Sequence, residues 1–370
     1  MFDDENYFMD LGSLSDSITE MIGNDYTYKK KLSQILKRAR QEAKKEYCYI
    51  CGKNVSSFCN SHSVPRFCLA NIATYGKVST LNAIIENPFL DTEKGINKAG
   101  TFHLICNECD SKVFADYEQP DNYADCPTPK MLAQMALKNS LKSISKRLLE
   151  IELFKSISKN SVHAQTFGEM KNVINEMDLK EYIDSYKKAK KALDKNSTSD
   201  YHVCYYKKLD YVVPIAFQSS LALIVDFNGN IINNVYDHSP KYKIQSLHIS
   251  IFPLKSETVI VMFVENEDRR YSPFFKQLKK LPLDEQLAAL TLIIYLYSED
   301  MYFSNFIENE VCENKRLCEA ARTSSDIVAD MPFFDPFEKL KQSYSLEKRF
   351  EIPNLLSEKY KMTCGQDTIE

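Results

Sequence analysis

The chain has 370 residues, with 47 Lys and Arg against 51 Asp and Glu and a formal net charge of −4. Its hydrophobic fraction of 44% is that of an ordinary folded protein, so a disordered chain is excluded, and the charge excludes a globally basic nucleic-acid binder. The nine glycines form no G-x-G-x-x-G or G-x-x-x-x-G-K motif, which argues against a Gly-rich nucleotide-binding domain.

The first 46 residues change from acidic to basic along the chain. Residues 1–27 form an acidic lead without Lys or Arg, whereas residues 28–46 carry apolar side chains at helical spacing, which predicts a helix. The cationic side chains on the remaining faces could contact phosphates or form a solvated surface. The candidate nucleic-acid-binding residues are Lys37, Arg38, Arg40, Lys44 and Lys45.

Two Cys-x-x-Cys motifs follow this helix, Cys48/Cys51 and Cys106/Cys109. Each motif lets a tight turn present two thiolates to one metal ion, and two such turns complete a tetrahedral four-sulfur zinc site. The sequence therefore predicts a structural Zn²⁺ bound by these four cysteines. Eleven cysteines without an export signal indicate a reducing, cytoplasmic location. No apolar run reaches the length of a membrane span, so no membrane partner is expected.

The rest of the chain predicts helices first and strands afterwards. Thr128 and Pro129 are a typical N-cap and first-turn pair, so a helix is expected over about 130–157 and another over about 167–194. Between 201 and 265 the pattern changes to that of strands, including a hairpin around Asn228-Gly229. Further helices are expected over about 284–298, 303–320 and 335–345.

The segment CYICG…NSHSVPRF…LICNECDSKVFADYE, at about 47–120, resembles an HNH endonuclease module, also called the His-Me finger or ββα-metal fold. That family has a first Cys-x-x-Cys, a His-x-x-Pro at a strand end and a second Cys-x-x-Cys. Here the middle element is His62-Ser63-Val64-Pro65. The Ser-His-x-x-Pro form is also similar to a group of bacterial proteins with large C-terminal domains, some of which occur in anti-phage defence settings. The resemblance covers roughly a fifth of the chain.

The resemblance implies phosphodiester hydrolysis, on DNA more than on RNA, with His62 as the general base. A neutral imidazole can deprotonate water near pH 7, and Mg²⁺ or another divalent cation would neutralise the phosphate oxygens. Where the family commonly has an Asp or His metal ligand before the base, this chain has Ser61, and the last motif residue, usually His or Asn, is Asp110. Asp110, Asp116 and Glu118 offer oxygen ligands for the cation. Asp110 and Glu118 are therefore predicted catalytic residues beside His62.

His62 has a second interpretation as a zinc ligand. Residues 59–62 form a Cys-x-x-His motif, so His62 could complete a purely structural site with Cys48, Cys51 and Cys59. In that case Cys106 and Cys109 would have another role.

The two carboxylates also have ordinary interpretations. Asp110 could cap the helix that follows the second cysteine motif, and Glu118 could be a solvated or salt-bridging carboxylate. At the level of function, the alternative to a nuclease is a non-catalytic zinc module that binds nucleic acid or protein.

Together these patterns predict an α+β fold class. A zinc-stapled ββα-metal, treble-clef-like module is followed by helices and an antiparallel sheet packed with helices. The expected domains are the acidic lead and basic helix at 1–46, the zinc module at 47–125, and an α+β domain at 126–370 that regulates the module or binds a protein partner.

Overall fold

The computed structural model describes residues 26–85, 91–158, 162–237, 239, 241–326 and 336–362, so most of the acidic lead lies outside the described residues. The chain divides into two units that alternate along the sequence. We call residues 1–63, 88–90 and 100–198 the helical unit, and residues 64–87, 91–99 and 199–370 the sheet unit. Helices and an antiparallel sheet are both present, which confirms the mixed α and β class. The boundary expected near residue 125 stays a prediction.

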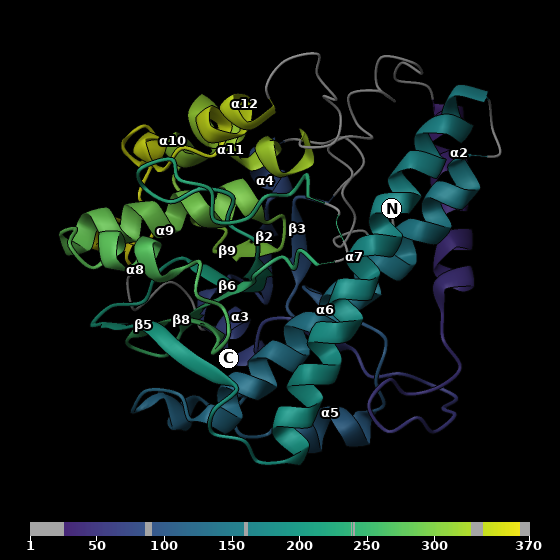
Figure 1. Ribbon diagram of the computed structural model, residues 1–370, viewed down its shortest axis with the longest axis horizontal. Coiled ribbons are helices and arrows are strands. Elements are labelled where there is room, and N and C mark those ends of the chain that lie inside the picture. Colours follow the sequence, from purple (N-terminus) through teal and green to yellow (C-terminus); the bar gives the residue numbers. More distant parts are fainter. Residues whose placement is uncertain are drawn as a thin grey trace. The chain divides into compact units, whose positions relative to one another are not determined.

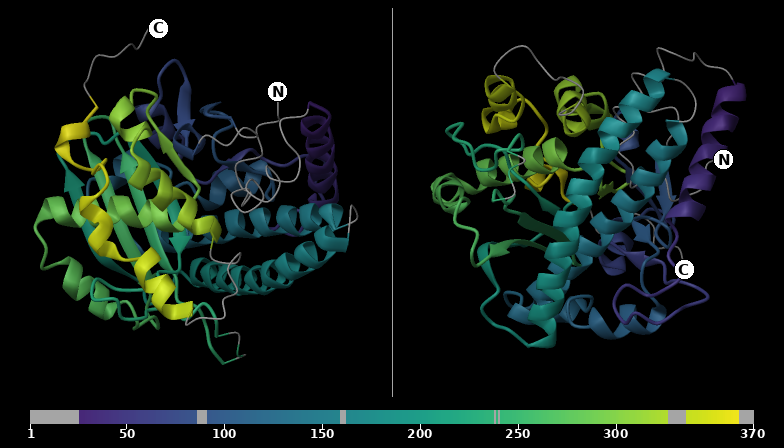
Figure 2. Two further views of the ribbon diagram at one scale, coloured as in Figure 1. Left: turned by 90° about the horizontal axis from the view of Figure 1, so that it is seen from above. Right: turned by 45° about the vertical axis from the view of Figure 1, so that its right-hand side comes forward.

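The helical unit is built on two long helices, α6 (Pro129–Ile157) and α7 (Val162–Asp194), which lie side by side (Figures 1 and 2). The start of α6 is as expected: the Thr128 hydroxyl accepts a hydrogen bond from the Met131 amide at 3.3 Å, and Pro129 occupies the first turn. Helix α2 (Tyr26–Ala43) packs against α6. Buried side chains occur all around α6, which makes it the central helix of this unit.

Short elements of the helical unit position the cysteine motifs. Strands β1 (Ser61–His62) and β4 (Thr101–Phe102) pair antiparallel, with Ser61 opposite Phe102 and His62 opposite Thr101. Helix α5 (Asn107–Val113) and the 3₁₀ turn η2 (Pro120–Tyr123) follow β4. The order in this part of the unit is therefore strand, strand, helix.

The sheet unit contains one antiparallel sheet of seven described strands with helices packed on it. In spatial order the strands are β3 (Glu93–Gly95), β2 (Lys77–Thr80), β9 (Met301–Phe303), β6 (Ile215–Leu221), β7 (Leu247–Pro253), β8 (Thr258–Glu265) and β5 (Tyr201–Leu209). Its described helices are α3 (Arg66–Ile72), α4 (Asn82–Ile85), α8 (Ser272–Leu278), α9 (Leu283–Tyr297), α10 (Asn309–Cys312), α11 (Lys315–Asp326) and α12 (Pro336–Ser343), with 3₁₀ turns η3 (Leu346–Phe350) and η4 (Glu358–Tyr360).

The main core of the sheet unit lies between one face of the sheet and helices α8, α9 and α11. Alternate residues of the strands, such as Ile249 and Ile251 of β7, point into this core, whereas Phe252 contacts Phe67 of α3 edge-on at 6.3 Å. Figure 2 shows the green and yellow helices along the sheet.

Most of the long insertion between the His-x-x-Pro motif and the second cysteine motif, residues 64–87 and 91–99, belongs to the sheet unit. It supplies α3, β2, α4 and β3, and β2 pairs with β9 from the far end of the chain. The insertion therefore completes one end of the sheet.

The expected hairpin around Asn228-Gly229 is only partly formed. Gly229 makes the turn at φ 74°, but the flanking segments are joined by a single bridge between Val225 and Ile231 instead of two strands. The Asp226 carboxylate accepts hydrogen bonds from the amides of Asn228 and Asn230, both at 2.9 Å. Such local side-chain bonds satisfy backbone groups that a strand ladder would need, so the prediction of two strands was wrong.

The helix expected over 303–320 is also interrupted. Strand β9 ends at Phe303, and two separate helices, α10 and α11, follow it. No helix within the described ranges combines the length and the apolar composition that crossing a bilayer requires.

Candidate metal centre

The first cysteine motif lies in a tight turn. The Gly52 amide donates to the Cys48 carbonyl at 2.8 Å, and Gly52 adopts φ 72°, a conformation that glycine accepts without steric cost. The Cys48 amide donates to the Lys53 carbonyl at 2.9 Å, which closes the turn. Lys190, in the lysine-rich end of α7, donates from Nζ to the Ile50 carbonyl at 2.8 Å. This hydrogen bond holds the turn in place.

The second cysteine motif begins helix α5. Cys106 is the N-cap residue and Cys109 lies in the first turn, so both side chains project from the helix start. The Tyr49 amide donates to the Leu104 carbonyl at 2.9 Å, and this bond places the first motif beside the segment leading into α5. The Cys106 amide also donates to Cys48 Sγ at 3.4 Å.

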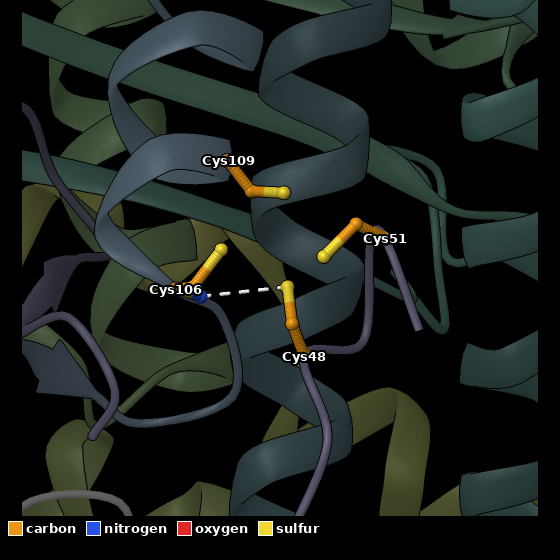
Figure 3. Close-up of side chains that lie close together, drawn as sticks. All are labelled: Cys48, Cys51, Cys106 and Cys109. Carbon is orange, nitrogen blue, oxygen red and sulfur yellow. Dashed lines mark hydrogen bonds between the residues drawn. The ribbon is translucent and has the colours of Figure 1, made fainter. Parts of the chain in front are cut away.

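The four sulfurs of Cys48, Cys51, Cys106 and Cys109 converge, and all lie within 4.8 Å of one another (Figure 3). In a tetrahedral zinc site with Zn–S bonds of 2.3 Å, sulfurs are about 3.8 Å apart. Burial and the hydrogen bonds that Cys109 makes with the other three cysteines raise its pKa. Zinc would offset this effect because it binds and stabilises thiolates. We call these four residues the cysteine site; they could hold a structural zinc ion, as the sequence predicted.

Cys59 does not join the cysteine site. Its thiol donates a hydrogen bond to Asp110 Oδ2 at 3.3 Å, and burial together with the Asp110 charge raises its pKa to about 12. Among the described residues, the candidate metal-binding group contains neither Cys59 nor His62. The geometry therefore favours the four-cysteine set over the alternative with Cys59 and His62.

A buried lysine lies next to the cysteine site. Lys138 Nζ donates to Asp110 Oδ1 at 2.8 Å, to Ser61 Oγ at 2.9 Å and to Glu118 Oε1 at 3.0 Å. The Ser61 hydroxyl in turn donates to Asp110 at 2.7 Å, and the ammonium lies 3.8 Å from the centroid of the Phe114 ring. The Lys138 side chain is 0% exposed. We call Ser61, Asp110, Glu118 and Lys138 the Lys138 cluster.

Lys138 belongs to a polar stripe on α6 that sequence reasoning missed. Lys130, Gln134 and Lys138 recur every four residues and so share one helix face. Lys130 Nζ pairs with Asp116 at 2.9 Å, and Gln134 Nε2 donates to Asp116 and to the Val113 carbonyl, both at 2.7 Å. The signal was visible as polar residues at helical spacing among apolar ones, but it does not identify the partners.

The structure brings together two of the three predicted catalytic residues, Asp110 and Glu118. His62 is in β1 and half-buried, directly after Ser61. Because successive side chains of a strand point to opposite faces, and Ser61 points to Asp110, His62 projects from the other face of the β1–β4 pair. Asp110 is not the helix cap that we considered as an alternative, since Cys106 holds that position. Glu118 forms a salt bridge with Lys138, which agrees with its ordinary interpretation as a salt-bridging carboxylate.

The oxygen ligands expected for a divalent cation already have partners. Asp110 and Glu118 both pair with Lys138, while Asp116 pairs with Lys130. Mg²⁺ requires oxygens at 2.0–2.1 Å in octahedral geometry, whereas the Lys138 ammonium occupies the point where the Asp110 and Glu118 oxygens converge. The carboxylates present therefore do not fit the catalytic Mg²⁺ that the resemblance implies.

The two carboxylates of the Lys138 cluster have pKa values shifted in opposite directions. Burial raises the pKa of Asp110, but the charge and hydrogen bond of Lys138 and the hydrogen bonds from Ser61 and Cys59 outweigh it, so the pKa lies below its ordinary value. For Glu118, burial and the Asp110 charge prevail over Lys138, and the pKa is raised. Asp110 therefore carries the negative charge that pairs with Lys138 near neutral pH.

Helix α2 has the two-sided character expected from its sequence. Leu36 and Ala39 are buried, while Lys37, Arg38 and Lys44 are exposed. Arg40 and Lys45 are half-buried, and Arg38 forms an ion pair with Glu42 at 2.7 Å. The basic face of α2 is consistent with either a solvated surface or a phosphate-binding one.

Comparison with known proteins gives no relative on which to base a function. No protein family, no curated protein and no solved structure matches this chain significantly.

Proposed function

We propose that the helical unit carries a zinc-stapled module of the HNH, ββα-metal type, and that this module binds nucleic acid. The observation that carries the proposal is the convergence of Cys48, Cys51, Cys106 and Cys109 around the strand–strand–helix segment. Closed four-cysteine zinc sites hold small modules together where a hydrophobic core is too small to do so. Duplex DNA is the partner we favour, through phosphate contacts.

The basic face of α2 supports nucleic acid as the partner. Lys37 and Arg38 are exposed on a helix whose opposite side packs against α6, and Lys44 is exposed directly after the end of this helix. A local set of cations can bind phosphates in a protein of net charge −4, because screening limits the reach of distant acidic residues.

Phosphodiester hydrolysis is the second candidate. It rests on His62, the His of the His-x-x-Pro motif, which lies on β1 outside the Lys138 cluster and is half-buried. An imidazole there would act as general base toward a water molecule. The lack of a fit for Mg²⁺ at Asp110 and Glu118 is the reason that binding ranks ahead of cleavage. We also propose that the sheet unit binds a protein partner.

Binding is tested by measuring the affinity for duplex DNA and for single-stranded RNA over a range of salt concentrations. We expect the affinity to fall steeply with salt, and the triple variant Lys37→Glu, Arg38→Glu, Lys44→Glu to flatten the logarithmic slope by roughly 3, since each phosphate contact contributes about 0.9. The matched control reverses three lysines near α8 in the sheet unit, Lys276, Lys279 and Lys280, with the same change in net charge. Equal slopes for both variants would return α2 to the solvated-surface interpretation.

The same preparations decide the second candidate. Plasmid DNA and RNA are incubated with wild type and with His62→Ala. If His62 is a base, the variant should keep its zinc and lose roughly 10²–10⁴-fold in cleavage rate. Binding without any cleavage by the wild type would leave the non-catalytic module as the function, and neither binding nor cleavage would remove both candidates.

A further inference from the structure

We propose that Lys138 is a built-in cation that replaces a divalent metal ion, so the helical unit binds one metal, at its cysteine site, and none at Asp110 and Glu118. The inference is independent of the proposed function, because it concerns the metal content and stability of the unit and not its partner. The sequence predicts Asp110, Asp116 and Glu118 as oxygen ligands of a cation, whereas in the structure these carboxylates pair with lysines of α6.

The hydrogen bonds of Lys138 have the geometry of a bound cation. An ammonium group has three N–H donors, and Lys138 uses all three, on Asp110 at 2.8 Å, on Ser61 at 2.9 Å and on Glu118 at 3.0 Å. The three acceptors come from β1, from α5 and from the segment after α5. Lys138 therefore joins the same set of elements that a metal ion with these ligands would join.

Lys138 also blocks the access of an ion to the point between the two carboxylates. The Lys138 side chain is 0% exposed, in the middle of the central helix α6, with the Phe114 ring 3.8 Å from its ammonium. Asp110 and Glu118 are 17% and 30% exposed, but the point where their oxygens converge is filled by the Lys138 ammonium. A divalent ion could bind both carboxylates at that point only if the Lys138 side chain moved away. An ion arriving beside Lys138 would also meet a like charge in a poorly solvated place.

The third predicted carboxylate, Asp116, is paired as well. It is bound to Gln134, one turn before Lys138 on α6, and to Lys130, two turns before it. All three predicted oxygen donors are thus paired by one helix face, at Lys130, Gln134 and Lys138. The polar stripe of α6 therefore neutralises and holds the carboxylates of residues 110–118, as a bound cation would.

The test compares Mn²⁺ binding by zinc-loaded wild type and variants, since Mn²⁺ prefers oxygen ligands and its free concentration is measured by electron paramagnetic resonance. Wild type should bind no stoichiometric Mn²⁺. Lys138→Ala removes the ammonium and leaves Asp110, Glu118 and Ser61 around the space, so it should bind about one equivalent. The double variant Lys138→Ala/Asp110→Asn should lose that binding. One equivalent of Mn²⁺ on wild type, abolished by Asp110→Asn, would overturn the proposal.

Thermal unfolding gives a second readout. Removing one partner of a buried ion pair is strongly destabilising, so Lys138→Ala should lower Tm by on the order of 10 °C, and Mn²⁺ or Mg²⁺ should restore part of the loss in this variant only. Lys130→Ala is the matched control. Lys130 also lies on α6 and also pairs with a carboxylate, that of Asp116, but its side chain is 53% exposed. Its Tm should change little and should not respond to Mn²⁺. If Lys138→Ala does not fold, the wild-type titration against Asp110→Asn still decides the question.

Discussion

Two buried ionisable side chains of this protein lie in opposite environments. In the helical unit, Lys138 is enclosed by two carboxylates and a hydroxyl, all of which accept hydrogen bonds from its ammonium. In the sheet unit, His248 has the opposite environment: it stacks on Phe263 with ring centroids 4.5 Å apart and meets the edge of the Tyr201 ring at 6.0 Å. Burial lowers the pKa of His248 to about 3, so this imidazole is neutral in the folded protein.

His248 should make the sheet unit sensitive to mild acid. The unfolded chain takes up a proton on this histidine near pH 6.5, while the folded chain does so only near pH 3, so stability present above pH 6.5 is lost as the pH falls through this window. Between pH 7 and pH 5 the loss from this group should be about 2 kcal/mol. We expect His248→Phe, a ring of similar size without the titration, to reduce the pH dependence by this amount.

This loss is measured by urea titration at pH 7 and at pH 5, with amide exchange of β7 and β8 as the signal that reports on the sheet unit. Identical pH dependence in wild type and His248→Phe would show that His248 does not control acid stability.

At the scale of elements, α6 organises the helical unit. One side packs against α7 and another against α2, while its polar stripe binds the segment that contains α5. A helix with partners on several sides cannot be amphipathic in the ordinary sense, and α6 is buried nearly all round. Damage to the contact between α6 and α7 should therefore weaken the whole unit.

Gly168 of α7 allows the close approach of α7 to the end of α6. A Cβ at this position would clash with the Ser158 hydroxyl and would lie 2.9 Å from the Phe154 carbonyl oxygen. Because a carbonyl of the helix backbone cannot move aside, Gly168→Ala should destabilise the helical unit by about 1–3 kcal/mol. The measurement is urea unfolding, with amide exchange of α6 and α7 as the signal that reports on the helical unit.

Two comparisons sharpen the test of Gly168. Met170→Ala, on the exposed side of the same helix, should change stability by less than about 0.5 kcal/mol. Adding Ser158→Ala to Gly168→Ala should recover only part of the loss, since the Phe154 carbonyl is unchanged. A stabilised Gly168→Ala protein would contradict the close contact, because it would mean that the helix propensity of Ala outweighs any clash.

At the scale of the whole molecule, the two units are interleaved in sequence. Residues 64–87 and 91–99 belong to the sheet unit although segments of the helical unit precede and follow them. Strand β2, from this insertion, pairs with β9 at Ser79–Phe303, so the sheet depends on contacts between distant parts of the chain. The cysteine site, by contrast, lies entirely within the helical unit.

Removal of zinc should therefore affect the two units unequally. A structural zinc site contributes on the order of 10 kcal/mol to folding, so a chelator or Cys109→Ser should expose residues 47–63 and 100–123 to amide exchange. Strands β7 and β8 of the sheet unit should stay protected. Metal analysis of the purified protein should give about one zinc per chain.

Two cysteine variants serve as controls for zinc removal. Cys126→Ser changes an exposed thiol outside the cysteine site, and Cys59→Ser changes the thiol that donates to Asp110. Both should keep their zinc. Complete metal removal with unchanged protection of residues 47–63 would contradict a structural zinc, and zinc lost in Cys59→Ser would restore the alternative ligand set.

The sequence by itself determined the features that depend on near neighbours. Motif spacing predicted the two pairs that converge in the cysteine site, and helical periodicity with Thr128-Pro129 predicted α6 within a residue at its start. The polar pairs in the chain were harder to interpret. The spacing of Lys130, Gln134 and Lys138 marks a face of α6, but a helix face carries no information about which segment will lie against it.

Only the tertiary structure decided what the polar groups of the module do. Asp110 looked like a cap or a metal ligand because both roles need only a carboxylate near a helix start, and its actual partner, Lys138, lies 28 residues further along the chain. The same holds for the sheet, where β6 is buried along almost its whole length and β9 has only three residues, so neither shows the alternation that indicates a strand. Contacts between distant segments decide such elements, since burial on both faces removes the local pattern from the sequence.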